Sequence, residues 1–538
     1  MTQLNPNNFK TQSRPIFSLH TAGWFILCAG VALSLGFRFF LSPDNPRREF
    51  RGVWIASVSN IDFPSRRGLD KAAFVREWKD LTDFYAQKNF NALIVQVRPS
   101  CDAFYPSRLG PWSVFLTGKQ GLAPKGDFDP MEEMIRETHK KGMEFHAWLN
   151  PYRAAMDADT ASLDAMHPLK QHPEWGIFYG GKWYLNPALP EVRYYITEVI
   201  EELLIHYDVD AIHFDDYFYP YKVTGEPYPD SLYFEKYGTG FFFIDDWRRH
   251  NVDELIRLVS KKIKSVSPHV KFGISPFGVY RNKSEDPVNG SETRAGQTCY
   301  DDLYYDIIKW LQNEWIDYVV PQIYWHKGFP PADYETLLDW WNEHAYDRHV
   351  YVGLAAYKVG NNPEQAWYSP KEMPRQIDMA RTREHISGQV FFSSRSLEKN
   401  PLGLVDSLVN RHYSTKAILP EFLFLDVEPP VAPMLDKVRL RKGHIRLSWR
   451  RPEREPAPAR FAIYRFEDTK PGDFDDPHNL LAVTPVSTKK TLEFTDKTAQ
   501  KGKTYTYVVS AINRANRESD LSNYRTVRLK SLGIKRIR

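Results

Sequence analysis

The sequence predicts an α/β protein: a (β/α)8 TIM barrel with long βα loops, followed by an all-β sandwich. Three observations lead to this prediction. From Glu49 onward, short apolar runs alternate repeatedly with segments of helical spacing, which is typical of a barrel. A proline-rich stretch, LPEFLFLDVEPPVAP, then interrupts the alternation. After it, short alternating segments are separated by turn residues, as expected for a β-sandwich.

The composition narrows the class of protein. A chain of 538 residues with 42% apolar and 26% charged side chains is long enough for more than one folded domain. A net charge of +4, with no basic stripe apart from the tail KSLGIKRIR, argues against nucleic acid as a partner. Aromatic residues are abundant at 14%, with 15 Trp and 30 Tyr. Clefts that bind carbohydrate use such rings as platforms, although many aromatic residues serve as core.

The first 45 residues are predicted to be a signal peptide or an N-terminal membrane anchor. Lys10 and Arg14 precede the apolar run WFILCAGVALSLG, and cleavage after Gly36 would fit an export signal. The alternative is an uncleaved anchor, because apolar character nearly resumes through Leu41. The protein is therefore expected in the periplasm or cell envelope, attached to the membrane if the anchor is not cleaved. Its three cysteines predict neither a disulfide framework nor a zinc site.

The barrel domain is expected over residues 46–418. Its eight predicted strands begin at Phe50, Asn91, Met143, Val209, Val270, Trp315, Val350 and Gly388. Amphipathic segments predict helices at 71–89, 129–142, 191–207, 245–266, 300–314 and 333–345. A doubly wound open sheet is the alternative fold, but no glycine-rich phosphate-binding turn follows the first strand.

The fourth strand, within DVDAIHFDDYFYP, carries the first candidates for catalysis. It is apolar from Val209 to Phe214 and then presents Asp215 and Asp216. Acid-base chemistry needs carboxyl groups that a rigid element holds at the edge of a cavity, and barrel enzymes place such groups at strand ends. The alternative interpretation of the pair is a helix cap or a solvated turn.

Other strand ends are rich in polar and aromatic residues that would converge on the same face of the barrel. The predicted substrate-binding residues are Gln96, Arg98, His146, Trp148, Asn150, Tyr152, His213, Tyr217, Arg281, Gln322, Tyr324, Trp325, Tyr357 and Arg395. Any one of them could instead be structural; His146, for example, could be a satisfied core histidine. Long aromatic loops, one over residues 151–190 and another reading YPYKVTGEPYPDS, predict a groove for an extended sugar chain.

The segments EFRGVWIASVSNIDFPS, IVQVRPSCDAFYPS, FHAWLNPYR, DAIHFDDYFYP, FGISPFGVYRN and WIDYVVPQIYW together resemble the glycosyl hydrolase-like 10 family of bacterial envelope proteins. The resemblance runs from about Arg48 to about Tyr413. It implies a (β/α)8 glycosidase that acts on peptidoglycan glycan strands, notably strands stripped of their peptides. It also implies that Asp215 is the best catalytic candidate and Asp216 the second.

A second catalytic carboxylate is not evident. Glycoside hydrolysis ordinarily needs two carboxyl groups, but SPFGVYRN, after the fifth strand, contains no Glu. Adjacent strand residues face opposite ways, so Asp215 and Asp216 can act together only if the strand has already ended. One could then be the general acid while the other orients a substrate acetamido group that attacks the anomeric carbon. Asp102 is the other possible partner. No cofactor or metal is expected, and His213 is expected to tune a carboxylate or bind a hydroxyl.

The C-terminal module is expected over residues 428–530, with a basic tail at 531–538. Its segments KGHIRLSWRRP, ARFAIYRFE and KTYTYVVSAINRANRESDLS, with Trp449 early and Tyr507 late, resemble a fibronectin type III domain. The module contains no catalytic grouping, and its expected role is spacing or docking onto the wall.

The leading functional hypothesis is an exported glycoside hydrolase that cleaves a cell-wall amino-sugar polymer. The alternative is a non-catalytic glycan-binding scaffold of the envelope, which the missing carboxylate after the fifth strand keeps open. A metal-dependent deacetylase is a third hypothesis, for which the sequence offers no clear ligand set.

Overall fold

The computed structural model describes residues 45–425, 427–487, 489–530 and 533–536. The segment that carries the predicted signal or anchor therefore lies, except for its last residue, outside the described residues. Within the described part of the chain, no helix combines the length and the apolar character that a membrane span requires.

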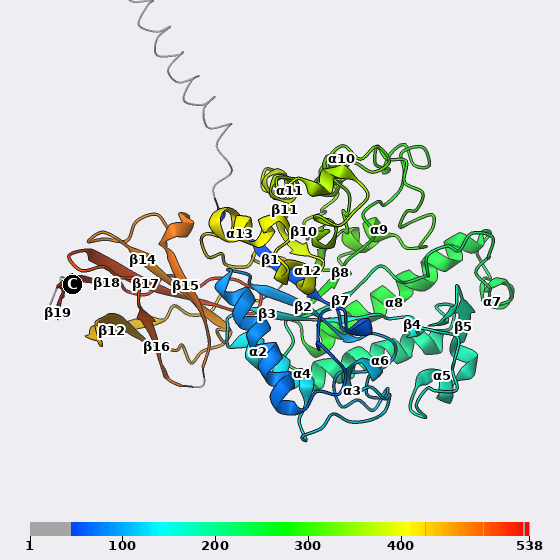
Figure 1. Cartoon of the computed structure of the whole chain (residues 1–538), viewed down its shortest axis with the longest axis horizontal. Helices are drawn as coiled ribbons and strands as arrows, with labels where there is room; N and C mark the ends of the chain where they lie inside the picture. Colours follow the sequence, from blue (N-terminus) through cyan, green and yellow to red (C-terminus); the bar gives the residue numbers. More distant parts are fainter. Residues whose placement is uncertain (1–44, 426, 488, 531–532, 537–538) are drawn as a thin grey trace, which may run out of the picture. The chain divides into compact units, whose positions relative to one another are not determined.

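A closed parallel barrel forms the larger part of the structure (Figure 1). Its strands, in order around the barrel, are β1 (Phe50–Ile55), β2 (Ala92–Arg98), β3 (Glu144–Leu149), β7 (Ala211–Phe214), β8 (Lys271–Ile274), β9 (Tyr318–Val319), β10 (His349–Leu354) and β11 (Ile386–Phe391). These strands are almost entirely buried, as expected for a parallel sheet covered on both faces. The barrel prediction is confirmed, and all eight strands were predicted.

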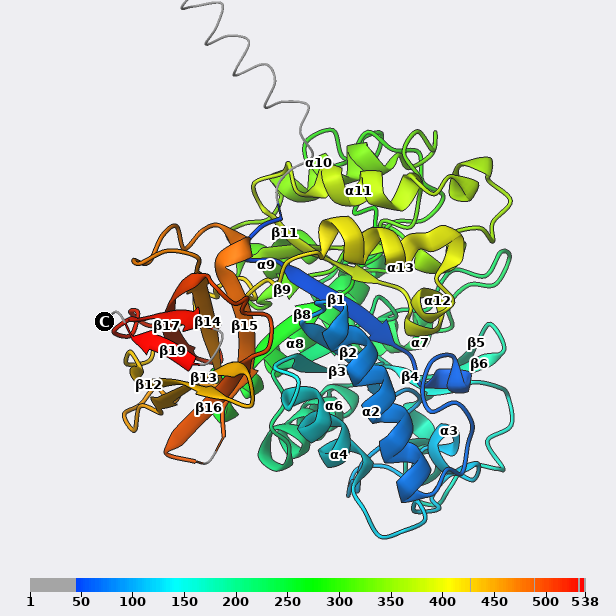
Figure 2. The same ribbon diagram turned by 60° about the vertical axis from the view of Figure 1, so that its left-hand side comes forward.

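Helices surround the strands on the outside of the barrel (Figure 2). They include α2 (Lys71–Gln87), α4 (Pro130–His139), α6 (Pro190–His206), α8 (Ile244–Val266), α9 (Ile307–Gln312), α10 (Tyr334–Glu343), α11 (Glu372–Ala380), α12 (Ser394–Glu398) and α13 (Leu404–Ser407). Side-chain caps fix several starts: Asp70 accepts a hydrogen bond from Ala73 N, and Asp333 accepts one from Thr336 N.

One predicted helix is much shorter than expected. The pattern over residues 300–314 predicts a helix throughout, but α9 begins only at Ile307. Tyr304 has φ 53°, which is incompatible with a continuous right-handed helix. Asp306 then caps the helix by accepting a hydrogen bond from Lys309 N at 3.1 Å.

Long loops at the carboxyl ends of the strands contain structure of their own. After β3, the strands β4 (Arg153–Ala155), β6 (Lys182–Leu185) and β5 (Gly176–Tyr179) form a small antiparallel sheet in that order. The short helices α3 (Val114–Thr117), α5 (Pro168–Gln171) and α7 (Ser231–Tyr237) lie in the same loop regions. These additions line the end of the barrel where the candidate site residues lie.

The C-terminal region is a two-sheet β-sandwich. One sheet has the order β12, β13, β16, and the other has the order β15, β14, β17, β18, β19. Their bounds are β12 (Met434–Arg441), β13 (His444–Arg450), β14 (Arg460–Phe466), β15 (Leu480–Pro485), β16 (Thr491–Asp496), β17 (Thr504–Ile512), β18 (Arg525–Lys530) and β19 (Gly533–Arg536). Trp449 is buried between the sheets, with its ring 5.6 Å from that of Phe461.

The proline-rich boundary begins as part of the barrel core. Leu419, Phe422 and Leu425 are buried, and they pack with the interior barrel residues and with Ala515 of the sandwich. Ala515 O accepts a hydrogen bond from Phe422 N at 2.9 Å. The chain after the last barrel helix therefore plugs the amino-terminal end of the barrel before it enters the sandwich.

Candidate active site

Two neighbouring carboxyl groups lie at the carboxyl end of β7. The strand ends at Phe214, so Asp215 and Asp216 belong to the loop that follows. The alternation of a regular strand therefore no longer applies, and both residues are buried, at 4% and 1% exposure. The strand has therefore ended before the pair, which is the condition under which Asp215 and Asp216 can act together.

Asp215 is held by an amide from the neighbouring strand. Asn150, directly after β3, donates a hydrogen bond from Nδ2 to Oδ2 of Asp215. The amide is itself oriented, because its Oδ1 accepts hydrogen bonds from Gln96 Nε2 at 2.5 Å and Arg153 Nη2 at 2.6 Å. Gln96 is fixed in turn, since its Oε1 accepts from the backbone N of Val58 at 2.8 Å. Residues after β1, within β2 and after β3 thus position one catalytic candidate.

The protonation of Asp215 is set mainly by its burial. Removal of the carboxyl group from water raises the pKa of Asp215 to about 7, although the Arg153 guanidinium lowers it. Oδ1 of Asp215 is buried and has no hydrogen-bond partner among the described residues. A carboxyl group with this pKa is about half protonated at pH 7 and can act as a general acid.

Asp216 has a different set of partners. Its Oδ2 accepts a hydrogen bond from the Tyr221 hydroxyl at 2.5 Å. Burial raises the pKa of Asp216, and hydrogen bonding by Tyr221 and Gln322 opposes that rise. Gln322 is anchored by its own hydrogen bond from Nε2 to Ser275 O at 3.0 Å. The two carboxyl groups are therefore held by separate networks, which allows them different roles.

Aromatic side chains from several strand ends form a series around the site, made of two groups of ring contacts: one from Tyr217 to Trp325 and one from Tyr324 to Phe392. Tyr217 and Tyr221 follow β7, and their ring centroids are 5.2 Å apart. The remaining contacts of the series are Tyr221 with Phe277 at 6.3 Å, Phe277 with Trp325 at 5.6 Å, Tyr324 with Tyr357 at 5.9 Å, and Tyr357 with Phe392 at 6.0 Å. Tyr357 is 40% exposed. Such rings are suited to stack on the apolar faces of sugars.

His146 and His213 lie inside the barrel and are fully buried. The Tyr318 hydroxyl joins them, at 2.8 Å from His146 Nδ1 and 3.1 Å from His213 Nδ1. His146 Nε2 is 2.9 Å from Glu144 Oε2, and His213 Nε2 is 3.1 Å from Ser275 Oγ. All four ring nitrogens are used within the protein. Substrate binding by these two histidines stays a prediction, which their burial does not favour. Their contacts instead suit a structural role beneath the carboxyl pair.

Several other predicted residues hold loops in place. Arg98 donates to Leu109 O and Tyr195 Oη, each at 2.7 Å. Arg281 forms a bidentate pair with Asp301 at 2.8 and 3.0 Å. These contacts position the loops after β2 and β8. The two guanidinium groups are therefore engaged within the protein rather than free to bind substrate.

The remaining predicted residues differ in exposure. Trp148 is 6% exposed, and its indole N–H has no hydrogen-bond partner of good geometry among the described residues. The indole lies close to Asp215 and lowers the pKa of that carboxyl group. Tyr152 is fully buried. Arg395 is exposed, and its backbone N–H binds Asp62 Oδ1 at 2.8 Å. Asp102 accepts hydrogen bonds from Val114 N at 3.3 Å and Gln120 Nε2 at 3.5 Å, so its contacts lie within its own loop.

Sequence reasoning missed four residues at this end of the barrel. Tyr221 binds Asp216, and Phe277 and Phe392 contribute rings to the aromatic series. Asp62 links the loop after β1 to the loop after β11, since it also accepts from Ser393 Oγ at 2.7 Å. The position of Phe392 directly after a strand could have marked it as a site residue. An apolar residue at a strand end, however, is usually interpreted as part of the core.

A large cavity lies away from the carboxyl pair. It has a volume of about 1430 Å3 and is lined by α4, α6 and the sandwich. Neither Asp215 nor Asp216 lines it. A smaller cavity of about 460 Å3 lies beside the loop after β7, lined by Tyr219, Tyr228 and Tyr304 among others. Among the described residues, no group of three or more His, Cys, Asp or Glu is arranged to hold a metal ion.

Comparison with known proteins identifies the relatives of this chain. "Glycosyl hydrolase YngK" from Bacillus subtilis is 45% identical over 494 residues, covering 90% of this chain and 95% of the relative. "Glycosyl hydrolase DigH" from Escherichia coli K12 is 36% identical over 376 residues, covering 65% of this chain and 84% of the relative. A solved glycoside hydrolase domain of PgaB (BpsB) from Bordetella bronchiseptica covers 67% of this chain and 98% of its own, with 12% identity and a TM-score of 0.41.

A family model described as glycosyl hydrolase-like 10 matches residues 49–369, which contain seven of the eight barrel strands and both carboxyl groups after β7. Both relatives are named glycosyl hydrolases, and the YngK match covers 90% of this chain. The prediction of a glycosidase is thus confirmed, and the non-catalytic scaffold is not supported. The chain belongs to the glycosyl hydrolase-like 10 family.

Proposed function

We propose that this enzyme cleaves glycosidic bonds in peptidoglycan glycan strands that have lost their peptides, or in a related amino-sugar polymer. The observation that carries the proposal is the buried carboxyl pair after β7, in which burial raises the pKa of Asp215 to about 7. A neighbouring carboxyl with separate partners suits a substrate that brings its own nucleophile, as an N-acetylated sugar does.

In this mechanism Asp215 is the general acid. It gives its proton to the glycosidic oxygen as the bond to the anomeric carbon breaks. Asp216 accepts a hydrogen bond from the acetamido N–H, and the acetamido carbonyl oxygen attacks the anomeric carbon to form a cyclic intermediate. The Asp215 carboxylate then takes a proton from a water molecule, which opens the intermediate and restores the starting protonation. Retention of anomeric configuration follows.

The surroundings of the pair support a polymeric carbohydrate substrate. The aromatic series from Tyr217 to Phe392 offers several rings for successive sugars. The loop sheet of β4, β5 and β6 adds Tyr184, whose pKa is raised by burial while the charge of Arg153 opposes that rise. We further propose that the protein is exported and acts in the periplasm or cell envelope, with the N-terminal segment as signal or membrane attachment.

We also propose that the C-terminal sandwich is a fibronectin type III domain. The arrangement of β12, β13 and β16 opposite β15, β14, β17 and β18 supports this assignment. The buried Trp449 and the Tyr507 hydroxyl, which donates to Asp496 Oδ2 at 2.8 Å, also support it.

The first test is product analysis of peptide-free glycan strands incubated with wild-type enzyme, Asp215→Asn and Asp216→Asn. Wild-type enzyme should release shortened reducing sugars, and each variant should be slower by roughly 100-fold or more. Asn91→Ala, which alters a buried amide near the other end of the barrel, serves as the control for general damage. Intact strands after incubation with active, folded wild-type enzyme would reject this substrate.

Chemically de-N-acetylated strands test the role of Asp216. Under the substrate-assisted mechanism they should bind without being cut, because the attacking oxygen is missing. Cleavage at the wild-type rate would instead require a second protein carboxylate as nucleophile or base. Proton NMR of the first product would then separate retention from inversion.

A further inference from the structure

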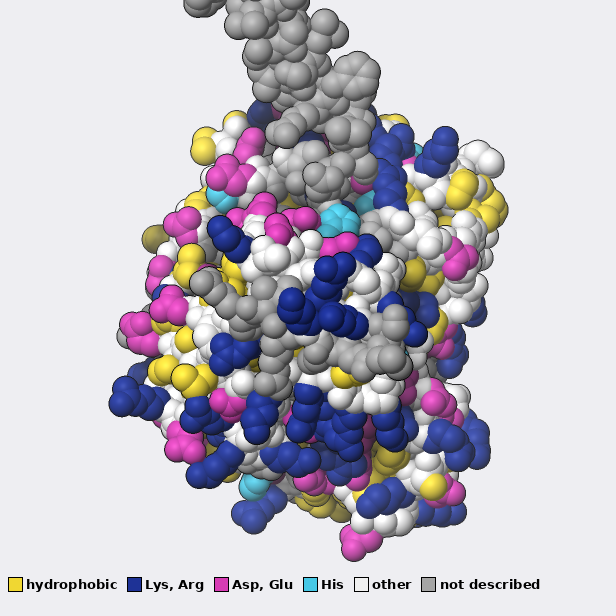
Figure 3. Space-filling view, turned by 90° about the vertical axis from the view of Figure 1, so that its left-hand side faces the viewer, with side chains coloured by type: hydrophobic (Ala, Val, Ile, Leu, Met, Phe, Trp, Pro, Cys, Tyr) yellow, Lys and Arg dark blue, Asp and Glu magenta, His cyan; other side chains and the backbone are white. Residues whose placement is uncertain are grey.

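Positive charge is concentrated in the sandwich. Residues 427–538 contain 24 Lys and Arg against 13 Asp and Glu, whereas residues 1–426 contain 47 against 54. The net charge of +4 for the whole chain is therefore the sum of a positive C-terminal part and a negative remainder. Lys and Arg side chains are spread over the end of the molecule that the sandwich forms (Figure 3). An asymmetry of this size suggests a polyanionic partner.

The cations gather because they alternate along strands. On β12, Lys437, Arg439 and Arg441 are exposed, while Val438 between them is buried. The partner strand β13 adds Arg446 and Arg450 on the same face: Arg446 is directly opposite Arg439, and Arg450 follows Arg446 by four residues. We call the surface made by Lys437, Arg439, Arg441, Arg446 and Arg450 the β12–β13 face.

The β12–β13 face has too few carboxylates to balance its charge. Arg439 and Arg446 share Glu493 of β16, and Arg450 pairs with Asp436 at 3.2 Å. Like charges placed directly across two strands destabilise a sheet, so the Arg439 and Arg446 pair would gain from further anions.

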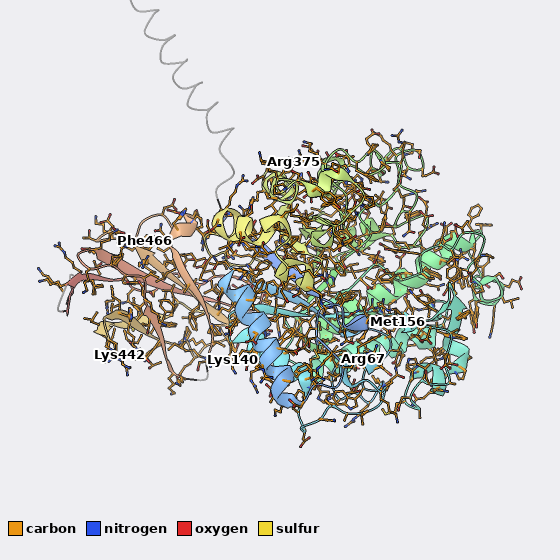
Figure 4. The ribbon with its side chains drawn as sticks, viewed as in Figure 1. Arg67, Lys140, Met156, Arg375, Lys442 and Phe466 are labelled. Carbon is orange, nitrogen blue, oxygen red and sulfur yellow. The ribbon has the colours of Figure 1, made fainter. Side chains whose placement is uncertain are left out.

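Three cations of this region take part in none of these ion pairs. Lys437, Arg441 and the neighbouring Lys442 form no ion pair within residues 45–425, 427–487, 489–530 and 533–536. Lys442 lies in the turn between β12 and β13, near the end of the sandwich farthest from the barrel (Figure 4). The surplus charge therefore extends from the face to the tip of the hairpin.

We propose that the β12–β13 face binds a flexible polymer of phosphodiester repeats that carries no bases. Alternate residues on one strand are roughly 6.6 Å apart, and neighbouring strands are about 4.8 Å apart. A flat grid of cations at this spacing can engage several successive phosphates of one chain. Binding would be driven by release of counterions and would weaken steeply with salt.

The face favours this partner over a nucleic acid or a membrane. Single-stranded nucleic acids bind on exposed aromatic platforms, and interfacial membrane binding uses a row of exposed apolar side chains. Met434 is the only large hydrophobic residue of β12, β13 or β16 that is exposed within the described part of the chain. The inference depends on charge and strand geometry alone, so it does not require the proposed glycan substrate.

The test measures binding of fluorescein-labelled poly(glycerol phosphate) to the full chain at 50 and 200 mM salt. The test variant is Lys437→Gln, Arg439→Gln and Arg441→Gln together. The control variant is Arg76→Gln, Lys79→Gln and Lys261→Gln, which removes the same charge from exposed positions on α2 and α8. The test variant should bind roughly 10- to 100-fold more weakly at 50 mM salt, and its salt slope should fall by about 2 to 3. The control should change affinity by less than about two-fold.

Four results would overturn the inference. They are no binding by wild-type enzyme, equal weakening by the control variant, equal affinity for single-stranded DNA of matched charge, and binding only to vesicles that contain anionic phospholipid. Hydrolysis of short soluble glycan fragments by the test variant should match wild type. This readout separates a failure of polyanion binding from a failure of the proposed catalytic function.

Discussion

At Asp215, two opposing effects act on one carboxyl group. Burial favours the protonated form, whereas the amide of Asn150 and the charge of Arg153 favour the ionised form. Burial is the larger effect, and it raises the pKa of Asp215 to about 7. The same residue therefore loses and regains a proton near neutral pH, as a general acid and base must.

Replacing Asp215 with Asn should stabilise the protein at high pH. An ordinary Asp has a pKa of about 3.9, so the folded state of wild type binds the extra proton more tightly than the unfolded state. This contribution to stability is fully present below about pH 4 and is lost as pH rises through about 7. Asp215→Asn carries no such loss. Denaturant unfolding at pH 8 should show a gain of roughly 1–4 kcal/mol over wild type, with a smaller difference at pH 5. A constant difference across this range would contradict the raised pKa.

Asn150→Ala should move the alkaline limb of activity to higher pH. The substitution removes a hydrogen bond to the ionised form of Asp215, so the pKa of that carboxyl should rise further. The rate should also fall by roughly 10- to 100-fold, because the acid is less well positioned. Asn91→Ala is the matched control, since Asn91 is a buried amide bound to Arg51 N and Glu49 O. It should lower stability and leave the pH limb unchanged.

The sequence predicted which residue types stand at the strand ends but not where their side chains point. Asp215, Asp216, Gln96 and Asn150 could be named because each follows or ends a buried strand. His146 has the same sequence signature, yet it points into the barrel interior. A single sequence contains no information that separates these two orientations.

At the scale of elements, a hydrogen-bond chain connects the two ends of the barrel. Burial lowers the pKa values of His146 and His213, so both rings are neutral. The Glu144 carboxylate can only accept, so His146 donates from Nε2 and its Nδ1 accepts from the Tyr318 hydroxyl. Tyr318 oxygen then accepts from His213 Nδ1. The chain has one direction, and it fixes the tautomers of both histidines.

Tyr318→Phe should cost roughly 2–5 kcal/mol of unfolding free energy. The variant leaves one acceptor on His146 and one donor on His213 buried without partners, and each such group costs roughly 1–3 kcal/mol. The control is Tyr351→Phe, because the Tyr351 hydroxyl is buried and has no partner among the described residues. That control should be neutral or slightly stabilising. Similar losses for both variants in urea titrations would reject the hydrogen-bond chain.

The position of Tyr318 also explains a glycine. A Cβ at Gly273, on the neighbouring strand β8, would lie 1.9 Å from Cζ of Tyr318. The ring therefore occupies the space that any side chain at residue 273 would need. Sequence periodicity predicted both strands, but only the structure pairs this glycine with this tyrosine.

The elements themselves were largely predictable, because apolar runs of strand length and helical periodicity are visible in one sequence. All eight barrel strands were found in this way. The failures were local: residues 300–306 are not helical, and Leu419, Phe422 and Leu425 belong to the barrel core rather than to a linker. Apolar residues next to prolines do not reveal which domain will bury them.

At the scale of the whole molecule, the sandwich supplies a cation to a buried carboxylate of the barrel. Arg460 of β14 reaches Oε1 of Glu144 at 3.1 Å, and Lys271 reaches the same oxygen at 2.6 Å. Burial tends to raise the pKa of Glu144, but these cations and His146 lower it overall. Arg48 adds a second connection, since it pairs with Glu518 at 3.1 Å. The two domains therefore share buried charge and should unfold together.

Arg460→Met should lower the stability of the barrel, although the residue lies in the sandwich. Breaking a buried ion pair typically costs about 3–5 kcal/mol, and here Lys271 retains part of the compensation, so roughly 2–4 kcal/mol is expected. Calorimetry should show one unfolding transition for wild type and two for the variant. Arg439→Met, at an exposed arginine of the same sandwich, is the control and should keep the single transition. A single transition in both variants would mean that other contacts couple the domains.

The contact between Arg460 and Glu144 also has a consequence for biosynthesis. The ribosome makes Glu144 and Lys271 long before it makes Arg460, and Phe422 emerges before Ala515. A nascent chain that contains every barrel strand therefore still lacks the partners that close the base of the barrel. Stalled chains that end near residue 430 should be cut by protease more readily than released full-length chains. Completion of the catalytic domain would then depend on a segment that is translated after every barrel strand.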